Sequence, residues 1–222
     1  MAAHKKIDAL IFDVDGTLWD TSEIVAESWT RAVRDNSELD YTYTAEYLRD
    51  VAFGKPMDEI AHILLPDSPE EEIQRISRAC FEYEDRDIRE KPARIYEGVR
   101  DILSKLRDEG FRLYIVSNCQ LGYIDACMDQ CGIKDLILDQ LCFGETGAIK
   151  GITINKLMER NGIKAENAAY IGDTKGDQAA SAYAGLCFIH AAYGFGRVED
   201  PDYSVSDIRE LPKLLKEINS ED

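Results

Sequence analysis

The sequence predicts an α/β fold, a three-layer α/β/α arrangement around a parallel sheet, with an all-helical block inserted near the start. Two observations lead to this prediction. From residue 93 onward, helical segments that end at glycine alternate with short apolar runs of strand length, which is the pattern of a parallel sheet covered on both faces. Residues 19–92 show only helical periodicity, which is typical of a small bundle. With 222 residues, 45% of them hydrophobic, the chain can bury a substantial core.

The first strand is expected at residues 7–12, an apolar run that ends abruptly in Asp13, Asp15 and Gly16. Two carboxylates at the end of a buried strand are costly unless a cation meets them. A divalent metal is the expected partner, because Mg²⁺ takes carboxylate and carbonyl oxygens. A simple aspartate-containing turn is the alternative interpretation.

Helical patterns fill the inserted block, in which no convincing strand is visible. Apolar side chains recur at helical spacing, and favourable N-cap residues precede the expected helices. The inner face of the last helix is marked by Ile73, Ile76, Cys80 and Tyr83. The helices are expected to begin at residues 20–22, at Thr44, at Met57 and at residue 69, and Pro92 is expected to end the block.

After the block, further strands are expected at residues 111–116, 168–171 and 186–189. Apolar stripes before each of them predict helices that end at glycine, which readily adopts the left-handed conformation of a helix C-terminus. The stripe before the last of these strands is formed by Ala179, Ala180 and Tyr183. A final helix is expected to carry Ile208, Leu211, Leu214, Leu215 and Ile218, and the glycine-rich residues 193–196 a turn near the strand ends.

Composition limits the possible partners. The net charge of -17 argues against a nucleic acid or an anionic membrane surface, both of which require clustered Lys and Arg. No apolar run is long enough to cross a membrane, and no signal peptide is expected, so the predicted location is cytoplasmic. The six cysteines form no zinc pattern and are expected to be buried thiols in a reducing compartment. A small anionic substrate stays compatible with the charge, because a metal and a few cations can reverse the local field.

The expected strands all end in small polar or acidic residues. In open parallel sheets, ligands bind beyond the carboxyl ends of the strands, so these residues should meet there. Acids that converge from different strands repel each other without a cation, and Asp13, Asp15 and Asp173 suit an octahedral Mg²⁺. The residues at the strand ends are Asp13, Asp15, Ser117, Asn118 and the segment from Gly172 to Asp177.

These residues resemble the motifs of a known family. The segments Asp13-Val14-Asp15-Gly16-Thr17, Ser117-Asn118, a lone Lys150 and Gly172-Asp173-Thr174-Lys175-Gly176-Asp177 are similar, in order and spacing, to the motifs of haloacid dehalogenase-like hydrolases. The helical block is similar to the cap of the phosphoglycolate-phosphatase-like branch. The resemblance implies a Rossmann-like core of residues 1–18 and 93–222 and a helical cap of residues 19–92.

The resemblance also implies a reaction, the hydrolysis of a phosphomonoester through an aspartyl phosphate. Asp13 would be the nucleophile, and Asp15 would protonate the leaving group and then activate water. Asp13, the Asp15 carbonyl and Asp173 would hold Mg²⁺. Lys150 would offset the repulsion between the carboxylate and the phosphate, and Asp177 would orient Lys150 or act through a water. Ser117 and the backbone at Asn118 would bind the transferred phosphoryl group.

Two lysine assignments have alternatives. Lys150 is followed by Gly151, where the family usually has proline, and Lys156 or Lys175 could fill the same role. In the cap, Lys55 resembles a residue of the loop that sets substrate specificity, so it could reach a substrate carboxylate or a second phosphate. A solvated loop lysine is the equally simple interpretation. Asp177 could also serve as a first-turn helix acid.

The same fold supports other functions, and the motif residues distinguish them from a phosphatase. A phosphosugar mutase usually has a hydrophobic residue in place of Thr17 and an arginine in place of Lys55. A dehalogenase lacks the acid at Asp15. A non-catalytic binding protein is expected to have lost one of the motif acids, all of which are present. The predicted substrate is a small phosphorylated metabolite, with phosphoglycolate, sugar phosphates, nucleoside monophosphates and pyrophosphate all open, and no oligomeric state is predicted.

Overall fold

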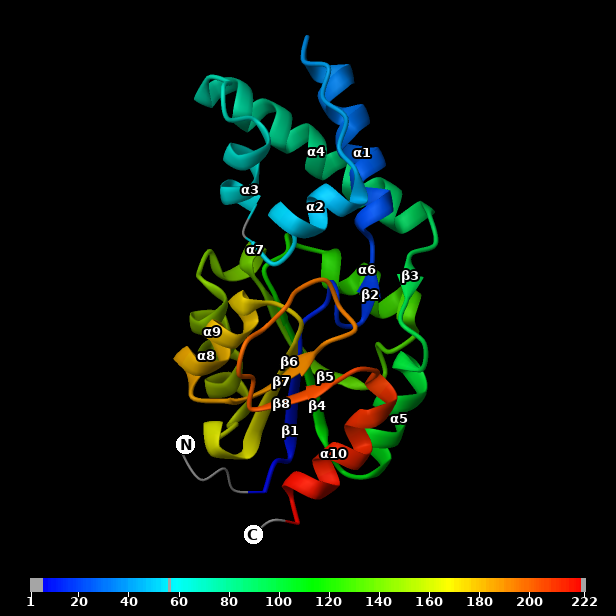
Figure 1. Ribbon diagram of the computed structural model, residues 1–222, viewed down its shortest axis with the longest axis vertical. Coiled ribbons are helices and arrows are strands. Elements are labelled where there is room, and N and C mark those ends of the chain that lie inside the picture. The colour runs from blue at the N-terminus through cyan, green and yellow to red at the C-terminus, as the bar shows by residue number, and fades with distance from the viewer. Residues whose placement is uncertain (1–5, 56, 221–222) are drawn as a thin grey trace.

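The computed structural model describes residues 6–55 and 57–220. Figure 1 shows two parts along the long axis of the molecule, an α/β part that contains both ends of the chain and a helical part above it. The α/β part begins with strand β1, Ala9–Phe12, and takes up the chain again from strand β3, Arg94–Ile95. This arrangement agrees with the predicted fold class.

In the described part of the chain, the main strands form a six-stranded parallel sheet with the order β5-β4-β1-β6-β7-β8. Strand β1 is central, and its Ala9 lies opposite Arg112 of one neighbour and Ala168 of the other. The remaining strands are β4 (Arg112–Ser117), β5 (Ile137–Cys142), β6 (Ala168–Gly172), β7 (Cys187–Ala191) and β8 (Tyr203–Val205).

Two of these strands were not predicted. Strand β5 forms one edge of the sheet and carries Asp139 and Gln140 in its middle, so it has no continuous apolar run. Strand β8 forms the other edge and has only three residues. Edge strands face solvent on one side, which removes the hydrophobic signal from which the inner strands could be predicted.

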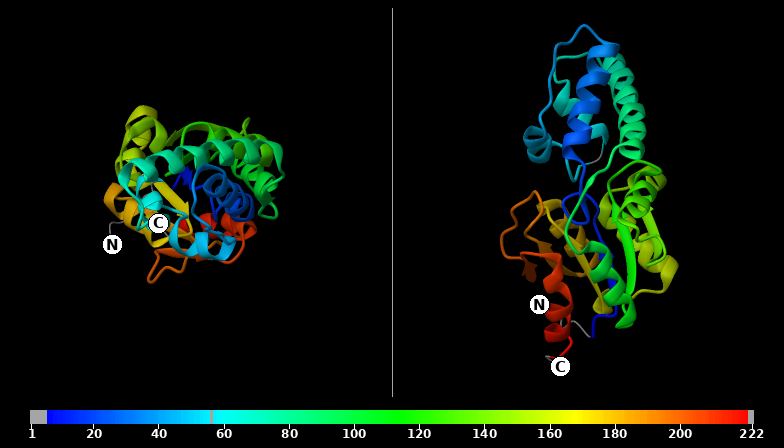
Figure 2. Two further views of the ribbon diagram at one scale, coloured as in Figure 1. Left: turned by 90° about the horizontal axis from the view of Figure 1, so that it is seen from above. Right: turned by 90° about the vertical axis from the view of Figure 1, so that its right-hand side faces the viewer.

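Helices cover both faces of the sheet, as Figure 2 shows. Alternate residues of β1 point to opposite faces, with Leu10 and Phe12 in one apolar cluster and Ala9 and Ile11 in the other. Helices α5 (Val99–Asp108), α6 (Tyr123–Cys131) and α10 (Leu211–Ile218) contribute to the first cluster. Helices α8 (Lys150–Asn161) and α9 (Lys175–Ala184) contribute to the second.

The predicted inner face of helix α9 was partly wrong. Tyr183 is 59% exposed and Ala179 is exposed as well, whereas Ala180 is buried as predicted, together with Asp177, Ser181 and Ala184. Thr174 fixes this face, because its hydroxyl accepts a hydrogen bond from the backbone N–H of Asp177 at 3.2 Å and begins the helix there. The buried positions follow from that start at helical spacing.

The helical part contains α1 (Ser22–Asn36), α2 (Ala45–Val51), α3 (Met57–Leu64) and α4 (Glu70–Glu90). All begin within a residue or two of the predicted positions. Thr44 caps α2, because its hydroxyl accepts a hydrogen bond from the N–H of Tyr47 at 3.2 Å. Helices α1 and α4 pack against each other, and the sheet lies beyond their lower ends (Figures 1 and 2).

The two connections between the parts form a short antiparallel ladder. Strand β2, Trp19–Asp20, pairs with β3, and Trp19 lies opposite Ile95. The prediction that residues 19–92 contain no strand is therefore wrong at its first two residues, which are too few to show alternation. The boundaries themselves, 18/19 and 92/93, stay a prediction.

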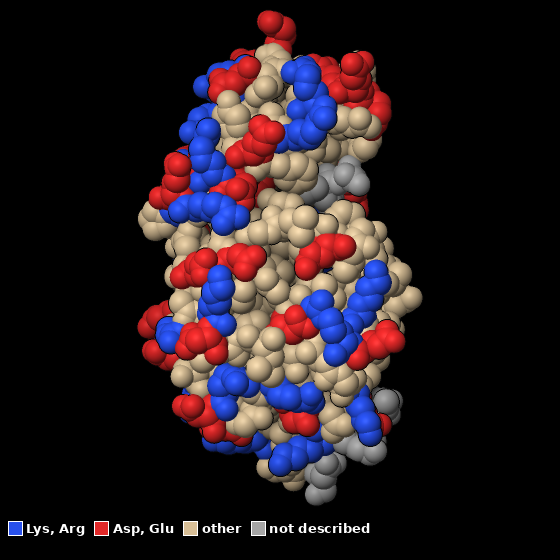
Figure 3. Space-filling model, turned by 180° about the vertical axis from the view of Figure 1, so that it is seen from behind, with Lys and Arg blue, Asp and Glu red and all other residues tan. Residues whose placement is uncertain are grey.

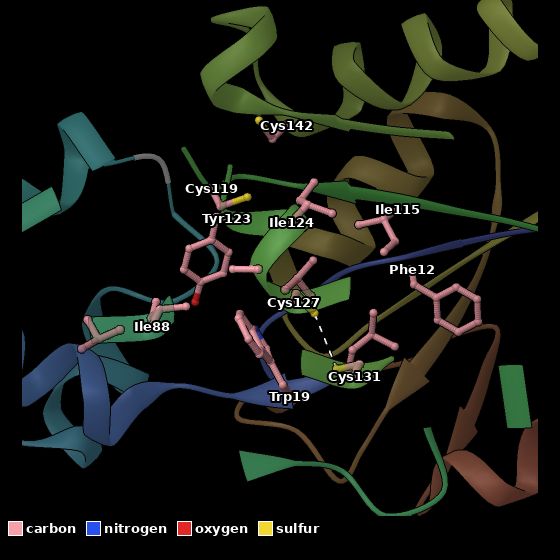
Figure 4. Close-up of a cluster of buried hydrophobic side chains, with 14 of the residues drawn as sticks. Phe12, Trp19, Ile88, Ile115, Cys119, Tyr123, Ile124, Cys127, Cys131 and Cys142 are labelled. Carbon is pink, nitrogen blue, oxygen red and sulfur yellow. Dashed lines mark hydrogen bonds between the residues drawn. The ribbon is translucent and has the colours of Figure 1, made fainter. Parts of the chain in front are cut away.

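One apolar cluster continues from the sheet into the helical part. Figure 4 shows its members from Phe12 and Ile115 of the sheet, through Trp19 and Tyr123, to Ile88 of helix α4. The Trp19 and Tyr123 rings meet edge to face with centroids 5.4 Å apart. All six cysteines are buried free thiols, which confirms that part of the prediction.

Figure 3 shows one face of the molecule, on which basic side chains are interspersed with acidic ones. The absence of a nucleic-acid partner stays a prediction. Among the described residues, no helix is both long and apolar enough to cross a membrane.

Candidate active site

The loop after β1 presents two acids at the carboxyl end of the sheet. The backbone N–H of Asp13 donates to the carbonyl of Ile171 in β6 at 2.8 Å, which fixes the first acid between neighbouring strands. Gly16 then turns the chain with φ +76°, and a side chain at this position would collide with the carboxylate of Asp173. Only glycine satisfies both requirements. The close approach of Asp173 therefore explains why the predicted motif has a glycine at this position.

Three carboxylates and one lysine meet in the buried centre of the site. Oxygens of Asp13, Asp173 and Asp177 lie within 4.8 Å of one another. Nζ of Lys150 donates to Oδ1 of Asp13 at 3.0 Å and to Oδ1 of Asp177 at 2.6 Å. All four side chains are buried, so these contacts are formed at low dielectric, where charge interactions are strong.

The lysine does not balance the acids, and their pKa values reflect this. Burial and the charge of Asp177 raise the pKa of Asp13 to about 6, although Lys150 opposes the shift. Burial, together with the charges of Asp177 and Asp13, raises the pKa of Asp173 well above its usual range. Burial lowers the pKa of Lys150, but Asp13 and Asp177 outweigh that effect and hold it well above 10.5. One further cation would relieve the excess negative charge.

The donor set fits a divalent metal. Oδ2 of Asp173 accepts hydrogen bonds from the backbone N–H groups of Phe195 at 2.7 Å and Gly196 at 3.4 Å. Its other oxygen, Oδ1, is buried without a hydrogen-bond partner, and such an atom is costly unless something meets it. Carboxylate oxygens are the ligands that Mg²⁺ prefers. The turn predicted at residues 193–196 therefore lies at the site, where it orients the carboxylate of Asp173.

The predicted metal set is Asp13, Asp15 and Asp173. The structure brings Asp13 and Asp173 together with Asp177, whereas the side chain of Asp15 points elsewhere. The ligand role of the Asp15 carbonyl stays a prediction, as does that of Asp177 in orienting Lys150. Asp177 also occupies the first turn of α9, where its carboxylate accepts from the backbone N–H of Thr174 at 3.0 Å, so both predicted roles are compatible.

The carboxylate of Asp15 is held by two hydroxyl groups. Its Oδ1 accepts hydrogen bonds from the phenol of Tyr123 at 2.7 Å and from the hydroxyl of Thr21 at 3.1 Å. Burial raises the pKa of Asp15 to about 8, against the opposing effect of the Tyr123 hydrogen bond. Asp15 therefore holds a proton at neutral pH in this environment, which suits an acid that protonates a leaving group.

The lysine at the centre is Lys150, as predicted. The alternatives, Lys156 and Lys175, are exposed, and Lys175 lies 3.4 Å from Glu199. A side chain at Gly151 would lie 2.7 Å from the exposed ring of Tyr183, so a close contact explains the glycine that follows Lys150. Thr17 is fully buried and its hydroxyl has no hydrogen-bond partner, while its carbonyl accepts from Tyr193 at 2.9 Å.

The residues predicted to bind phosphate lie at the end of β4. Ser117 is buried and lines the cavity above the acids. Asn118 lines the same cavity, and its side-chain Nδ2 donates to the carbonyl of Gly54 at 2.8 Å. This hydrogen bond joins the sheet to the loop after α2, so Asn118 contacts both parts of the molecule. Roles in phosphate binding stay predictions for both residues.

The cavity between the two parts measures about 50 Å³. That is space for roughly three or four water-sized groups. The core contributes Asp13, Asp15, Lys150, Tyr123 and the segment from Ser117 to Gln120. The helical part contributes Val25, Trp29, Ala52, Phe53, Gly54, Lys55, Ile60 and Glu84.

Two charged groups of the helical part line this cavity. Lys55 is half-exposed, and its Nζ donates to the carbonyl of Val51 at 3.0 Å and lies 3.8 Å from Glu59. Glu84 is only 4% exposed. Its Oε2 accepts from the Trp29 indole at 2.6 Å and its Oε1 from the Gln120 amide at 3.1 Å. Burial raises the pKa of Glu84 from 4.5 to about 7.

Sequence reasoning missed Thr21, Tyr123 and Glu84. Thr21 was considered only as an N-cap, but it makes no capping hydrogen bond and bonds Asp15 instead. Glu84 continues the helical stripe of Ile76 and Cys80 at i+8 and i+4, so an acid on a buried face was the available signal.

Comparisons with known proteins identify relatives that match nearly the whole chain. The phosphoglycolate phosphatase of Vibrio vulnificus is 27% identical over 94% of this chain and 96% of its own length. A crystal structure described as a predicted phosphoglycolate phosphatase from Haemophilus somnus has a TM-score of 0.83 at 19% identity, over 95% and 98% of the two chains. CbbY from Rhodobacter sphaeroides in complex with phosphate has a TM-score of 0.80 at 22% identity, over 92% and 96%.

The phosphoglycolate phosphatase relatives and a hydrolase family model indicate that the protein is an enzyme, a phosphoric monoester hydrolase. A family model for haloacid dehalogenase-like hydrolases matches residues 10–191. The chain therefore belongs to the haloacid dehalogenase-like hydrolase family, on its phosphoglycolate-phosphatase-like branch.

Removal of the Tyr123 hydroxyl should impair Asp15. In Tyr123→Phe, Asp15 loses the shorter of its two hydrogen bonds, and kcat on an aryl phosphate should fall by roughly tenfold. Because that hydrogen bond lowers the pKa of Asp15, the alkaline limb of the pH–kcat profile should move to higher pH. Tyr183→Phe, at an exposed tyrosine, is the matched control. An unchanged profile in Tyr123→Phe would show that the hydroxyl does not act on Asp15.

Burial of Glu84 should make stability depend on pH. A carboxyl whose pKa is raised in the folded state stabilises the fold below its unfolded pKa, and this stabilisation is lost as the pH rises through the folded pKa. Relative to wild type, Glu84→Gln should therefore gain about 3 kcal/mol in free energy of unfolding between pH 4.5 and pH 7.5. Urea denaturation at several pH values measures this difference. The exposed Glu82→Gln variant should show no such trend, and a flat difference for Glu84→Gln would contradict the prediction.

Proposed function

We propose that the protein is a Mg²⁺-dependent phosphatase that hydrolyses a small phosphomonoester through an aspartyl phosphate formed on Asp13. The observation that carries the proposal is the position of Lys150, whose Nζ lies 3.0 Å from Asp13 and 2.6 Å from Asp177 below the cavity. A nucleophilic carboxylate must approach a phosphate dianion, and an adjacent fixed cation reduces that repulsion.

In the first step, a carboxylate oxygen of Asp13 attacks phosphorus, and the bond between phosphorus and the leaving oxygen breaks. The proton on Asp15 passes to that oxygen. In the second step, Asp15 takes a proton from a water molecule, which attacks phosphorus and releases Asp13 and inorganic phosphate. Tyr123 and Thr21 orient the Asp15 carboxylate for both transfers.

The proposed magnesium ligands are Asp13, Asp173 and the carbonyl of Asp15, with Asp177 nearby. When bound, Mg²⁺ would supply positive charge to the phosphoryl oxygens and the attacking carboxylate. Lys150 holds Asp13 in place, and Asp177 in turn holds Lys150. Ser117 and the backbone at Asn118 would bind the phosphoryl oxygens that remain.

The helical part, for which we propose residues 19–92, would act as a cap over the phosphoryl site. The Asn118–Gly54 hydrogen bond supports this role because it holds a cap loop against the sheet. A cavity of about 50 Å³ supports a leaving group of few atoms. The proposed substrate is therefore a small phosphorylated metabolite in the cytoplasm, with Lys55 and Glu84 as the charged cap groups that face it.

Substitution of the nucleophile should abolish turnover. Asp13→Asn should lower Mg²⁺-dependent phosphate release by about 10⁴-fold, because the amide cannot attack phosphorus. Asp8→Asn, at an acid before the same strand, is the matched control. Rapid acid quench with labelled substrate should leave covalent label on the wild type and none on Asp13→Asn. Phosphate release by Asp13→Asn at the wild-type rate would overturn the proposed function.

The metal requirement should depend on Asp173. Chelation with EDTA should remove activity and added Mg²⁺ should restore it. Asp173→Asn should raise the Mg²⁺ concentration for half-maximal activity by about tenfold or more, because it replaces a charged oxygen ligand by a neutral one. Isothermal calorimetry with Mg²⁺ alone gives the same comparison without turnover. Full activity in EDTA would rule out the metal.

A further inference from the structure

We propose that Glu84 sets the chemical class of the leaving group. The enzyme would prefer phosphomonoesters whose leaving group carries a hydrogen-bond donor, a hydroxyl or an ammonium, and would reject those that carry a carboxylate at the same place. This inference rests on the proposed phosphatase function and names its substrate class. Phosphoglycolate, the substrate in the name of several relatives, would accordingly be a poor substrate of this enzyme.

The first argument is the hydrogen-bonding capacity of Glu84. A carboxylate has about four acceptor positions and no donor. The Trp29 indole and the Gln120 amide occupy one position on each oxygen, at 2.6 and 3.1 Å. Both partners are themselves lining residues of the cavity, so the carboxylate is fixed at its wall and keeps further acceptor positions. A donor on the leaving group would satisfy one of them, and an acceptor would not.

The second argument is the charge around the cavity. The described lining residues carry the acids Asp13, Asp15 and Glu84 and the cations Lys55 and Lys150. Lys150 is already paired with two carboxylates. Lys55 donates to a backbone carbonyl and lies near Glu59. A substrate carboxylate would therefore meet Glu84 while both cations of the lining already have partners, and juxtaposed like charges in a buried site are strongly unfavourable.

The third argument is the cost of keeping an acid at this position. Glu84 follows Ile76 and Cys80 on the inner face of α4, where an apolar residue would pack without desolvation. Its side chain forms hydrogen bonds that connect α4 to α1 and to the segment after β4. A purely structural role is therefore the competing interpretation. Loss of a purely structural role would lower kcat/KM for all substrates alike, whereas loss of selection would depend on the chemical group at the end of the leaving group. This difference can be measured.

The test uses four phosphomonoesters with the same two-carbon leaving group and different ends: 2-hydroxyethyl phosphate, O-phosphoethanolamine, ethyl phosphate and phosphoglycolate. With the full-length protein and Mg²⁺ at about pH 8, above the pKa of about 7 at which Glu84 ionises, kcat/KM for the hydroxyl and ammonium members should exceed that for phosphoglycolate by about tenfold or more. Ethyl phosphate should fall between. In Glu84→Gln, the ratio of kcat/KM for 2-hydroxyethyl phosphate to kcat/KM for phosphoglycolate should fall by about tenfold, because the negative charge is gone.

Controls distinguish substrate selection by Glu84 from a folding defect and from selection by Lys55. Glu82→Gln, exposed on the same helix, should leave the ratio unchanged. If Glu84→Gln does not fold, as judged by circular dichroism, the wild-type order of the four substrates still decides. A preference for phosphoglycolate that Lys55→Met removes would assign specificity to Lys55 and overturn the proposal.

The failures of the two proposals are distinguishable. Equal turnover of the four esters, or turnover of an aryl phosphate alone, overturns the assignment to Glu84 and leaves the phosphatase. The same ratio of kcat/KM for 2-hydroxyethyl phosphate to phosphoglycolate in wild type and in folded Glu84→Gln would also overturn the assignment to Glu84. No Mg²⁺-dependent turnover of any ester overturns the proposed function itself.

Discussion

The ion pairs of Lys150 with Asp13 and Asp177 are the interaction on which the site depends. They join the end of β1 to the first residues of α8 and α9, so three segments far apart in sequence must arrive together. Removal of one partner from a buried ion pair leaves an uncompensated charge, at a cost of about 3–5 kcal/mol. The sheet order, with β1 between β4 and β6, is what makes the meeting possible. The acids exceed the lysine in number, which supports the proposed place of a metal among them.

The segment after β4 connects this centre to the helical part. Asn118 donates to Gly54, Gln120 donates to Glu84, and Tyr123 donates to Asp15. The segment of residues 118–123 thus forms hydrogen bonds with a loop and a helix of the helical part and with the proposed general acid. A movement of the helical part would disturb the hydrogen bonds to Gly54 and Glu84, and it would reach Asp15 through the hydroxyl of Thr21. Such a movement would couple the recognition of the leaving group to the position of the group that protonates it. The β2–β3 ladder and the apolar cluster of Figure 4 restrict such movement.

The sequence predicted the parts of the site that depend on strand ends and missed those that depend on contacts between elements. Asp13, Asp15, Ser117 and Asp173 follow buried strands, so the parallel sheet alone brings them to one edge. Strands β5 and β8 carry no apolar run, and the two-residue β2 is too short for any periodic signal. Tyr183 was misplaced because the start of α9 is fixed by a cap. Tyr123 looked like an ordinary helix residue, since its partner Asp15 lies 108 positions away.

Glu84 shows why charge in a sequence says little until its surroundings are known. Helix α4 begins with glutamates at 70–72 that are mostly exposed and suit the helix dipole, whereas Glu84 on the same helix is buried at the cavity. Asp13 and Asp15 differ in the same way, because one faces a lysine and the other faces hydroxyl groups. In the functions proposed above, the same functional group would therefore serve as nucleophile, acid and selector in one cavity. The neighbours of each carboxylate, supplied by different elements, assign its role.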